Sequence, residues 1–323
     1  MNHYAVTMTA KEKAEFLATG ALQTLNPNEI RGKTLFSLIS PGTELNCLYC
    51  GNNFPAAPGY AAVFIAEETG SEVKDIEKGT VFFCAGNHRS FQQCDAAGAV
   101  KVPPGLLPEK AVIARLTGVS MTTLMTTVAR PGDMVIISGA GPVGYLAAQI
   151  FSVSGYEVLI VEPDTDRRAL VMKISGLKAV DKIPLEDKSI VGKVALVVEC
   201  SGHEQAVLDA CRVVRKRGEV VMVGVPWQRK TELYAHEILY EVFYKYVVLR
   251  SGWEWEVPAQ SSDFRPHSIH SGYQTALKWL AEDKVKLDGL ITLHSPSNPQ
   301  EAYQALLSRR ANGLFQIFDW SKV

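Results

Sequence analysis

Two different patterns of apolar and polar residues divide this chain. Between residues 118 and 252, short apolar runs alternate with stretches whose apolar residues recur at helical spacing. The runs have the length of strands and lie at residues 134–138, 157–161, 194–199, 219–224 and 247–250. Nearly continuous apolar character is typical of parallel strands that are buried on both faces. This part of the chain therefore predicts an α/β domain with a doubly wound parallel sheet.

The two flanking parts of the chain do not show this alternation. Up to residue 116, turn-forming clusters such as residues 40–43 separate short apolar stretches, which indicates a β-rich domain. After residue 252 the pattern is mixed, with helices expected at residues 270–282 and 299–309. We expect a tail of this size to rejoin the first domain. The predicted segments are 1–116, 117–252 and 253–323.

A glycine-rich turn follows the first of the predicted parallel strands. It reads Gly139-Ala140-Gly141-Pro142-Val143-Gly144, and the residues behind it recur at helical spacing. Glycines in such a strand–turn–helix unit let the backbone approach a pyrophosphate, and the helix N-terminus supplies free N–H groups. The next strand ends in Glu162, which can accept hydrogen bonds from an adenosine ribose. We predict a dinucleotide site rather than a turn that binds nothing, and its residues are Gly139, Gly141, Pro142, Val143, Gly144 and Glu162.

Charge and composition exclude several other classes of partner. The formal net charge is −1 over 323 residues, so neither nucleic acid nor an anionic membrane is an expected partner. The longest apolar runs are too short to span a bilayer. The N-terminus reads Met-Asn-His-Tyr and lacks the pattern of a secretory signal, which favours a cytoplasmic protein whose six cysteines are reduced thiols.

Several motifs in a fixed order give the chain a family resemblance. They lie at residues 70–73, 79–81, 130–133, 139–144, 198–202 and 223–226. With them the sequence resembles the medium-chain dehydrogenase/reductase superfamily, which includes the zinc alcohol dehydrogenases and the quinone reductases. The resemblance implies a Rossmann domain beside a β-rich, GroES-like catalytic domain, a small-molecule substrate and a homodimer. It also implies that Glu162 and Arg167 flank the adenosine ribose, and that the nicotinamide end meets Cys200, Ser201, Gly202, Val223, Gly224 and Val225.

The residues that hold catalytic zinc in this superfamily are replaced here. Zinc members carry a cysteine before a Gly-Thr/Ser-Asp turn, whereas this chain reads Ser40-Pro41-Gly42-Thr43-Glu44. Their Gly-His-Glu appears as Gly59-Tyr60-Ala61, and a later ligand would fall near Leu116. The Gly-Thr-Glu variant resembles zinc-lacking members, so we expect no metal. The alternative is a four-thiolate zinc site made by Cys47, Cys50, Cys84 and Cys94, for which buried free thiols are the simpler interpretation.

Without a metal, another group must protonate or hydrogen-bond the alkoxide that forms during hydride transfer. By resemblance, Thr43 matches the residue that relays protons in the zinc members, and Tyr60 replaces a metal-binding histidine. The phenol of Tyr60 is therefore a candidate proton donor. His88, in a loop before a strand, is a candidate end point of the relay from Thr43. Glu44 is expected either to orient Thr43 or to pair with Arg89.

The predicted function is reversible oxidation of a secondary alcohol, such as a polyol, cyclitol or sugar-like substrate, without zinc. NAD is favoured over NADP because the Glu162 carboxylate would repel a 2′-phosphate, although Arg167 and Arg168 keep NADP open. One alternative is a quinone or enone reductase, which also needs no metal and usually prefers NADPH. The alternative from another class is a non-catalytic redox sensor that binds the cofactor without turnover.

Overall fold

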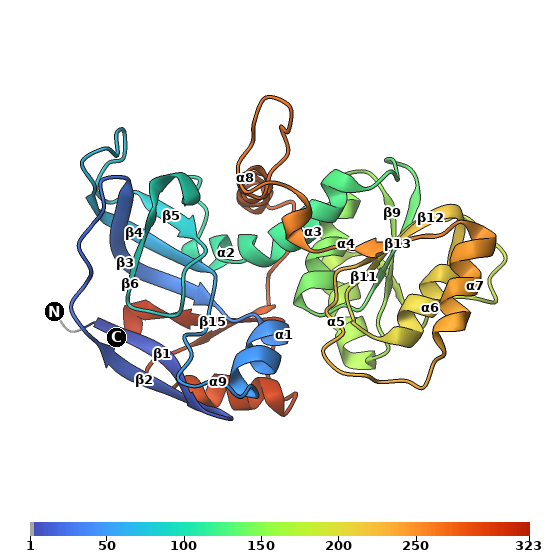
Figure 1. Ribbon diagram of the computed structural model, residues 1–323, viewed down its shortest axis with the longest axis horizontal. Coiled ribbons are helices and arrows are strands. Elements are labelled where there is room, and N and C mark those ends of the chain that lie inside the picture. Colours follow the sequence, from blue (N-terminus) through green and yellow to red (C-terminus); the bar gives the residue numbers. More distant parts are fainter. Residues whose placement is uncertain (1–2) are drawn as a thin grey trace. The chain divides into compact units, whose positions relative to one another are not determined.

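The computed structural model describes residues 3–323, which divide into two compact units. Unit 2 comprises Leu116–Lys286, and unit 1 comprises the described residues up to Arg115 together with Leu287–Val323. The first boundary lies within one residue of the predicted one. The return to unit 1 comes at Leu287, well beyond the predicted residue 253. Figure 1 shows the elements of each unit.

Unit 2 is built on a six-stranded parallel sheet with the strand order β10-β9-β8-β11-β12-β13. Its strands are β8 (Met134–Ser138), β9 (Glu157–Val161), β10 (Lys178–Val180), β11 (Val194–Glu199), β12 (Val214–Met222) and β13 (Val248–Ser251). Its helices are α3 (Ala114–Thr126), α4 (Pro142–Val153), α5 (Thr165–Ser175), α6 (Glu204–Val213), α7 (Ala235–Lys245) and α8 (Ile269–Ala281). The predicted doubly wound parallel sheet is confirmed.

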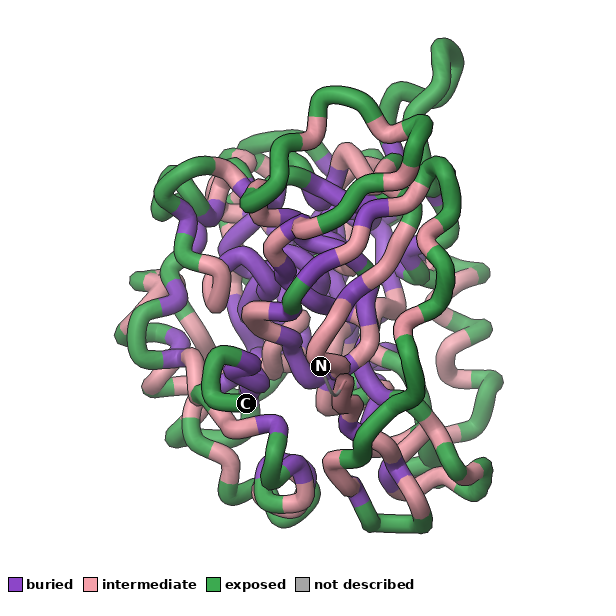
Figure 2. The backbone as a smooth tube through the Cα atoms, turned by 90° about the vertical axis from the view of Figure 1, so that its left-hand side faces the viewer, coloured by how far each residue is buried: buried purple, intermediate pink, exposed green. Residues whose placement is uncertain are grey.

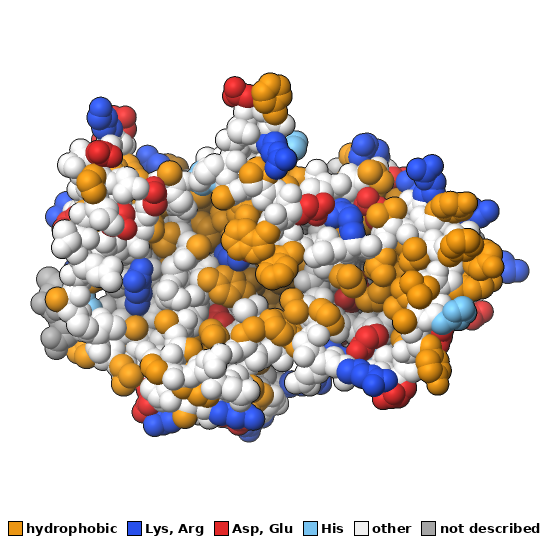
Figure 3. Space-filling model, viewed as in Figure 1, with side chains coloured by type: hydrophobic (Ala, Val, Ile, Leu, Met, Phe, Trp, Pro, Cys, Tyr) orange, Lys and Arg blue, Asp and Glu red, His pale blue; other side chains and the backbone are white. Residues whose placement is uncertain are grey.

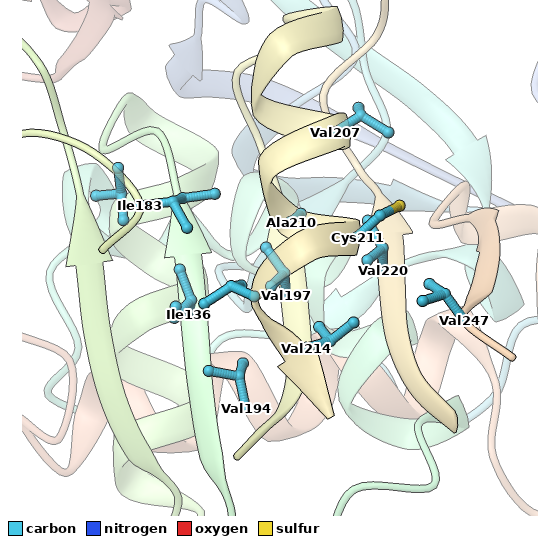
Figure 4. Packing of buried hydrophobic residues seen from close by; sticks show 12 residues of the cluster. Ile136, Ile183, Val194, Val197, Val207, Ala210, Cys211, Val214, Val220 and Val247 are labelled. Atoms are coloured by element: carbon cyan, nitrogen blue, oxygen red, sulfur yellow. The ribbon is translucent and has the colours of Figure 1, made fainter. Parts of the chain in front are cut away.

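The core of this unit joins the sheet to the helix α6. In Figure 4, Ile136, Val197 and Val220 project from neighbouring strands, and α6 carries Val207 and Ala210 above them. All five side chains are buried. Removal of this apolar surface from water, at about 25 cal/mol per Å², stabilises the unit and fixes its helices on the sheet.

The predicted ends of two helices, α5 and α6, agree with the structure to different degrees. The sequence predicts a helix that is capped by Asp164 or Thr165 and closed by Gly176. Helix α5 does begin after Asp164, whose side chain accepts a hydrogen bond from the Arg167 N–H, and it ends at Gly176 with a φ of 71°. Helix α6, in contrast, ends at Val213, and residues 214–218 already belong to β12. Lys216, Arg217 and Gly218, which are typical of a helix end and were expected to end α6, therefore lie in a strand. Arg215, one of its residues, forms a 3.0 Å ion pair with Asp133.

The predicted return at residue 253 is wrong because α8 packs on α3. A Cβ atom added at Gly118 of α3 would overlap the ring of Tyr273 on α8. Gly272 of α8 lies at ordinary contact distance from Met121 and Met125. This close helix contact keeps residues 253–286 with unit 2 and depends on Gly118, which leaves room for the Tyr273 ring.

Unit 1 contains a mostly antiparallel sheet with the order β14-β15-β3-β4-β5-β7, and β6 also pairs with β3. A separate hairpin is formed by β1 (His3–Ala10) and β2 (Lys13–Thr19). The other strands are β3 (Glu29–Leu38), β4 (Ala62–Thr69), β5 (Val81–Cys84), β6 (Phe91–Asp95), β7 (Val100–Lys101), β14 (Ile291–His294) and β15 (Phe315–Asp319). The helical segments used below are α1 (Pro41–Thr43), the π-helical Glu44–Tyr49, α2 (Pro108–Ala111) and α9 (Pro299–Leu307). In Figure 2 the buried residues lie in the interior, and most of the outermost segments of the chain are exposed.

Exposed aromatic residues gather on α7, a helix that the sequence did not predict. Tyr240, Phe243 and Tyr244 are all exposed, and they contribute to the apolar patch at the right-hand edge of Figure 3. Apolar residues on an exposed face obscure the periodicity from which helices are recognised. Within residues 3–323, no helix is long and apolar enough to cross a membrane.

The packing of unit 2 makes a testable prediction. Ile136→Ala should destabilise the protein by about 2–4 kcal/mol, because Ile136 is completely buried between sheet and helices and its loss leaves a cavity. The matched control is Leu239→Ala on α7, where the side chain is exposed and the change should stay within about 0.5 kcal/mol. Denaturant unfolding of both variants measures the difference. Equal destabilisation would contradict the assigned core.

Candidate active site

The glycine-rich turn after β8 has the geometry of a phosphate-binding loop. Gly139 adopts a φ of 91°, and its N–H donates to the Val161 carbonyl at 2.8 Å. A Cβ at Gly144 would overlap the Gly139 carbonyl oxygen, so only glycine lets α4 start this close to the turn. Gly141, by contrast, faces open space at its Cβ position, and Pro142 is the first residue of α4. These residues fit the pyrophosphate of a dinucleotide, which would lie against the exposed backbone at the helix N-terminus.

Glu162 connects this loop to the end of β9. Its buried carboxylate accepts hydrogen bonds from the backbone N–H groups of Ala140 at 2.9 Å and Asp164 at 3.0 Å. Arg167, which was expected to flank the adenosine ribose together with Glu162, lies 3.5 Å from the same carboxylate. Arg168 instead donates to the Glu162 carbonyl oxygen at 2.6 Å. The carboxylate thus has lone pairs left for ribose hydroxyls, but its charge is partly balanced by Arg167.

Glu199 organises the two loops expected at the nicotinamide end, a role that the sequence analysis missed. Its side chain accepts hydrogen bonds from the N–H groups of Ser201 at 2.8 Å and Gly202 at 3.0 Å. Its carbonyl oxygen accepts those of Val223 at 2.8 Å and Gly224 at 2.7 Å. Burial raises the pKa of Glu199, and the hydrogen bonds from Ser201 and Gly202 oppose that shift. The sequence feature that could have indicated this role is the position of Glu199, an acidic residue, at the end of an apolar strand.

In unit 1, the structure brings the hydroxyl groups of Thr43 and Tyr60 together. The Tyr60 hydroxyl donates to Ser40 Oγ and lies 3.3 Å from Thr43 Oγ1. Ser40 and Thr43 flank the turn that follows β3, and Tyr60 precedes β4. Ser40 was not predicted, although its place just before Pro41 in the variant turn was a signal. We call Ser40, Thr43 and Tyr60 the hydroxyl cluster.

A cation lies against this cluster. The guanidinium carbon of Arg115 is 4.6 Å from the centroid of the Tyr60 ring, and Arg115 is only 9% exposed. Burial raises the pKa of Tyr60, whereas hydrogen bonds with Ser40 and Thr43 and the charge of Arg115 lower it. The sequence analysis missed Arg115. Its signal was a charged residue directly after the buried apolar run 111–114.

His88 and Glu44 belong to a separate, completely buried network. Glu44 Oε2 is 3.1 Å from His88 Nε2 and accepts from the Tyr303 hydroxyl at 2.6 Å. His88 Nδ1 is 2.8 Å from Ser37 Oγ, which accepts from Trp320 Nε1 at the same distance. Each polar side-chain group in this chain of contacts therefore has a hydrogen-bond partner. We call these five residues the Glu44 network.

The contacts described here do not form the expected proton relay from Thr43 to His88. The Glu44 network meets the turn through the backbone N–H of Ser40, which donates to Glu44 Oε1 at 2.7 Å. A backbone amide does not pass a proton at neutral pH in the way that a hydroxyl does. The expected pairing of Glu44 with Arg89 is also not formed, because Arg89 bonds Gln92 at 3.2 Å. His88 is thus placed to hold the turn rather than to receive its proton.

The residues present do not fit a catalytic zinc ion. Residues 3–323 contain no group of three or more His, Cys, Asp or Glu side chains that could hold a metal. Tyr60 takes the place of a histidine ligand, and the Arg115 cation beside it would repel a second cation. The cysteines of the alternative zinc site are free, with Cys84 hydrogen-bonded to Cys94 and Cys47 exposed.

Comparison with known proteins agrees with this architecture. A family model described as zinc-binding dehydrogenase matches residues 142–254. Sorbitol dehydrogenase of Halalkalibacterium halodurans is 27% identical over 219 residues, which cover 65% of this chain and 59% of that enzyme. The chain thus spans less than two thirds of that relative's length.

Solved structures resemble the chain over almost its whole length. Galactitol-1-phosphate dehydrogenase from Escherichia coli superposes with a TM-score of 0.83 at 16% identity, covering 98% of this chain and 99% of that one. L-Idonate 5-dehydrogenase from E. coli K-12 gives 0.81 at 14% identity, with 99% and 98% covered. At these identities the likeness shows the fold, namely a Rossmann domain with a β-rich catalytic domain. With the family match in unit 2, the chain is similar to zinc-binding dehydrogenases in sequence over part of its length and to alcohol dehydrogenase-like enzymes in fold.

Proposed function

We propose that this protein is a zinc-independent oxidoreductase that transfers a hydride between NAD(H) and a secondary alcohol or its carbonyl. The observation that carries the proposal is the hydroxyl cluster, in which a half-buried phenol is hydrogen-bonded to two side-chain hydroxyls. Such a group can donate a proton to a developing alkoxide while it stays neutral at pH 7. The glycine-rich loop of unit 2 supports the dinucleotide part of the proposal.

The substrate class is proposed to be a polyol, a cyclitol or a sugar-like alcohol. Its support is the similarity to proteins whose names are sorbitol dehydrogenase and galactitol-1-phosphate dehydrogenase. When bound, the cofactor supplies or accepts the hydride. Tyr60 is proposed to give the proton to the carbonyl oxygen during reduction, and Thr43 to pass a proton from solvent to Tyr60 afterwards.

We further propose that the protein forms a homodimer. The exposed aromatic residues of α7, which include Tyr240, Phe243 and Tyr244, support an interface with a second copy because such a cluster is unusual on a free surface. Strand β13 lies at the edge of the sheet, and an unpaired strand edge favours association.

The first prediction concerns the metal. Purified protein should contain well under one zinc ion per chain, because the family's ligand positions hold Pro41, Tyr60 and Ala61. Chelators should leave the turnover of alcohol unchanged. Elemental analysis together with the activity assay tests this, and stoichiometric zinc that is lost together with activity would refute zinc independence.

The second prediction concerns the cofactor. NADH should bind more tightly than NADPH, since the Glu162 carboxylate would face a 2′-phosphate in a partly desolvated site. Glu162→Ser should reduce this preference by about tenfold, or roughly 1.4 kcal/mol. Glu162 also holds the loop, so the variant can weaken both cofactors, and the ratio of their dissociation constants is the informative measurement. Tighter binding of NADPH than of NADH by the unaltered protein would contradict the role given to Glu162. Arg167 or Arg168 would then hold the 2′-phosphate.

The third prediction concerns the proton donor. Tyr60→Phe removes the hydroxyl and keeps the ring, so kcat should fall by about a hundredfold with little change in NADH affinity. Thr43→Val should act in the same direction to a smaller degree. Tyr246→Phe, at an exposed position outside the proposed interface, is the control and should be neutral. Unchanged kcat in Tyr60→Phe would move the quinone or enone reductase alternative to first place.

A further inference from the structure

We propose that Arg115 is a positioning residue whose positive charge, held against the Tyr60 ring, stabilises the phenolate form of Tyr60 and so replaces the charge that a metal would supply. The catalytic part of this inference rests on the function proposed above. The electrostatic part concerns the chain alone and can be measured without a substrate.

The guanidinium group of Arg115 has a fixed position at the Tyr60 ring. Arg115 is nine-tenths buried, and its guanidinium carbon lies 4.6 Å from the centroid of the Tyr60 ring. Contact with an aromatic face is a geometry that the planar guanidinium adopts readily. Arg115 directly follows residues 111–114 in the chain. These residues are fully buried, so they restrict the motion of the Arg115 backbone. The cation is therefore held at the ring rather than free in solvent.

Two opposite charges act on Tyr60. From the π-helical segment, the buried Glu44 carboxylate raises the pKa of Tyr60, and Arg115 lowers it. His88 faces Glu44 and Ser37 rather than Tyr60. Burial is the largest effect and also raises the pKa of Tyr60. Arg115 is thus the cation that opposes both burial and the nearby carboxylate.

The proton balance of the reaction places a charge on Tyr60. In reduction, hydride forms the new C–H bond, and the O–H bond of Tyr60 breaks as its proton forms the O–H bond of the alcohol. Tyr60 is left as a phenolate next to Glu44, and the cofactor is left oxidised. The hydroxyl of Ser40, which accepts from Tyr60 in the resting state, can rotate and donate to that phenolate. Arg115 supplies the remaining stabilisation, and a proton from solvent restores the phenol.

The test follows the ionisation of Tyr60 directly. Protein labelled with ¹³C at the tyrosine Cζ atoms is titrated by NMR, and Tyr60→Phe identifies the signal of Tyr60 by its loss. Arg115→Met should move the titration of Tyr60 to higher pH by roughly one unit or more, because an opposite charge at this distance has been removed. Arg115→Lys keeps the charge and should recover most of the shift. Arg310→Met, which removes an exposed cation of the same unit, should leave Tyr60 unchanged.

A second measurement connects the charge to turnover. In the direction of alcohol oxidation, kcat/KM should rise with pH and level off when Tyr60 is ionised. In Arg115→Met the plateau should move to higher pH, whereas Arg115→Lys should restore its position. A residue that only supports the fold would lower activity or stability without moving this plateau.

The outcomes separate this inference from the proposed function. An unchanged Tyr60 titration in folded Arg115→Met would overturn the role of Arg115, whatever the activity. If Arg115→Met does not fold, Arg115→Lys decides the question. A Tyr60 titration in Arg115→Lys that lies at a clearly different pH from that of the unaltered protein would also overturn the role of Arg115. A shifted titration in a protein that turns over no alcohol or carbonyl would support the charge at Tyr60 and refute the proposed function.

Discussion

The buried carboxylate of Glu44 is the interaction on which the arrangement of unit 1 depends. It accepts hydrogen bonds from the turn after β3 through Ser40, from the loop before β6 through His88, and from α9 through Tyr303. A buried charge is tolerated only when its lone pairs are satisfied, so these segments must all be in place together. The same turn carries Ser40 and Thr43 of the hydroxyl cluster. The position of the proposed chemistry is therefore fixed by a carboxylate that neither gives nor receives the transferred proton.

Unit 2 uses the same device twice. Glu162 and Glu199 both follow or end a buried strand, and both accept backbone N–H groups from a neighbouring loop. At the carboxyl edge of a parallel sheet the loops have few other partners, and a carboxylate accepts several N–H bonds at once. The loops at the predicted cofactor site are thus fixed by hydrogen bonds to carboxylates at the ends of the strands. Glu162 adds a possible ribose contact to this structural role.

The sequence was informative where a structural property is local. The glycine turn, the cap at Asp164 and the parallel strands were all predicted because each depends on residues close in the chain. Contacts between distant segments were not predicted, since periodicity contains no information on them. Arg115 reaches Tyr60 across 55 positions of the chain. The path of the relay to His88 failed for the same reason, because Tyr303 and Trp320 approach from the far end of the chain.

The discontinuity of unit 1 has a consequence for synthesis on the ribosome. Its central strand β3 (Glu29–Leu38) pairs with β15 (Phe315–Asp319), so that sheet is complete only when almost the whole chain has been made. Unit 2 is continuous and can fold earlier, because all its strands emerge together. During that interval the early strands of unit 1 expose an edge that its own last strand will cover. The native sheet of unit 1 therefore forms at the end of synthesis rather than during it.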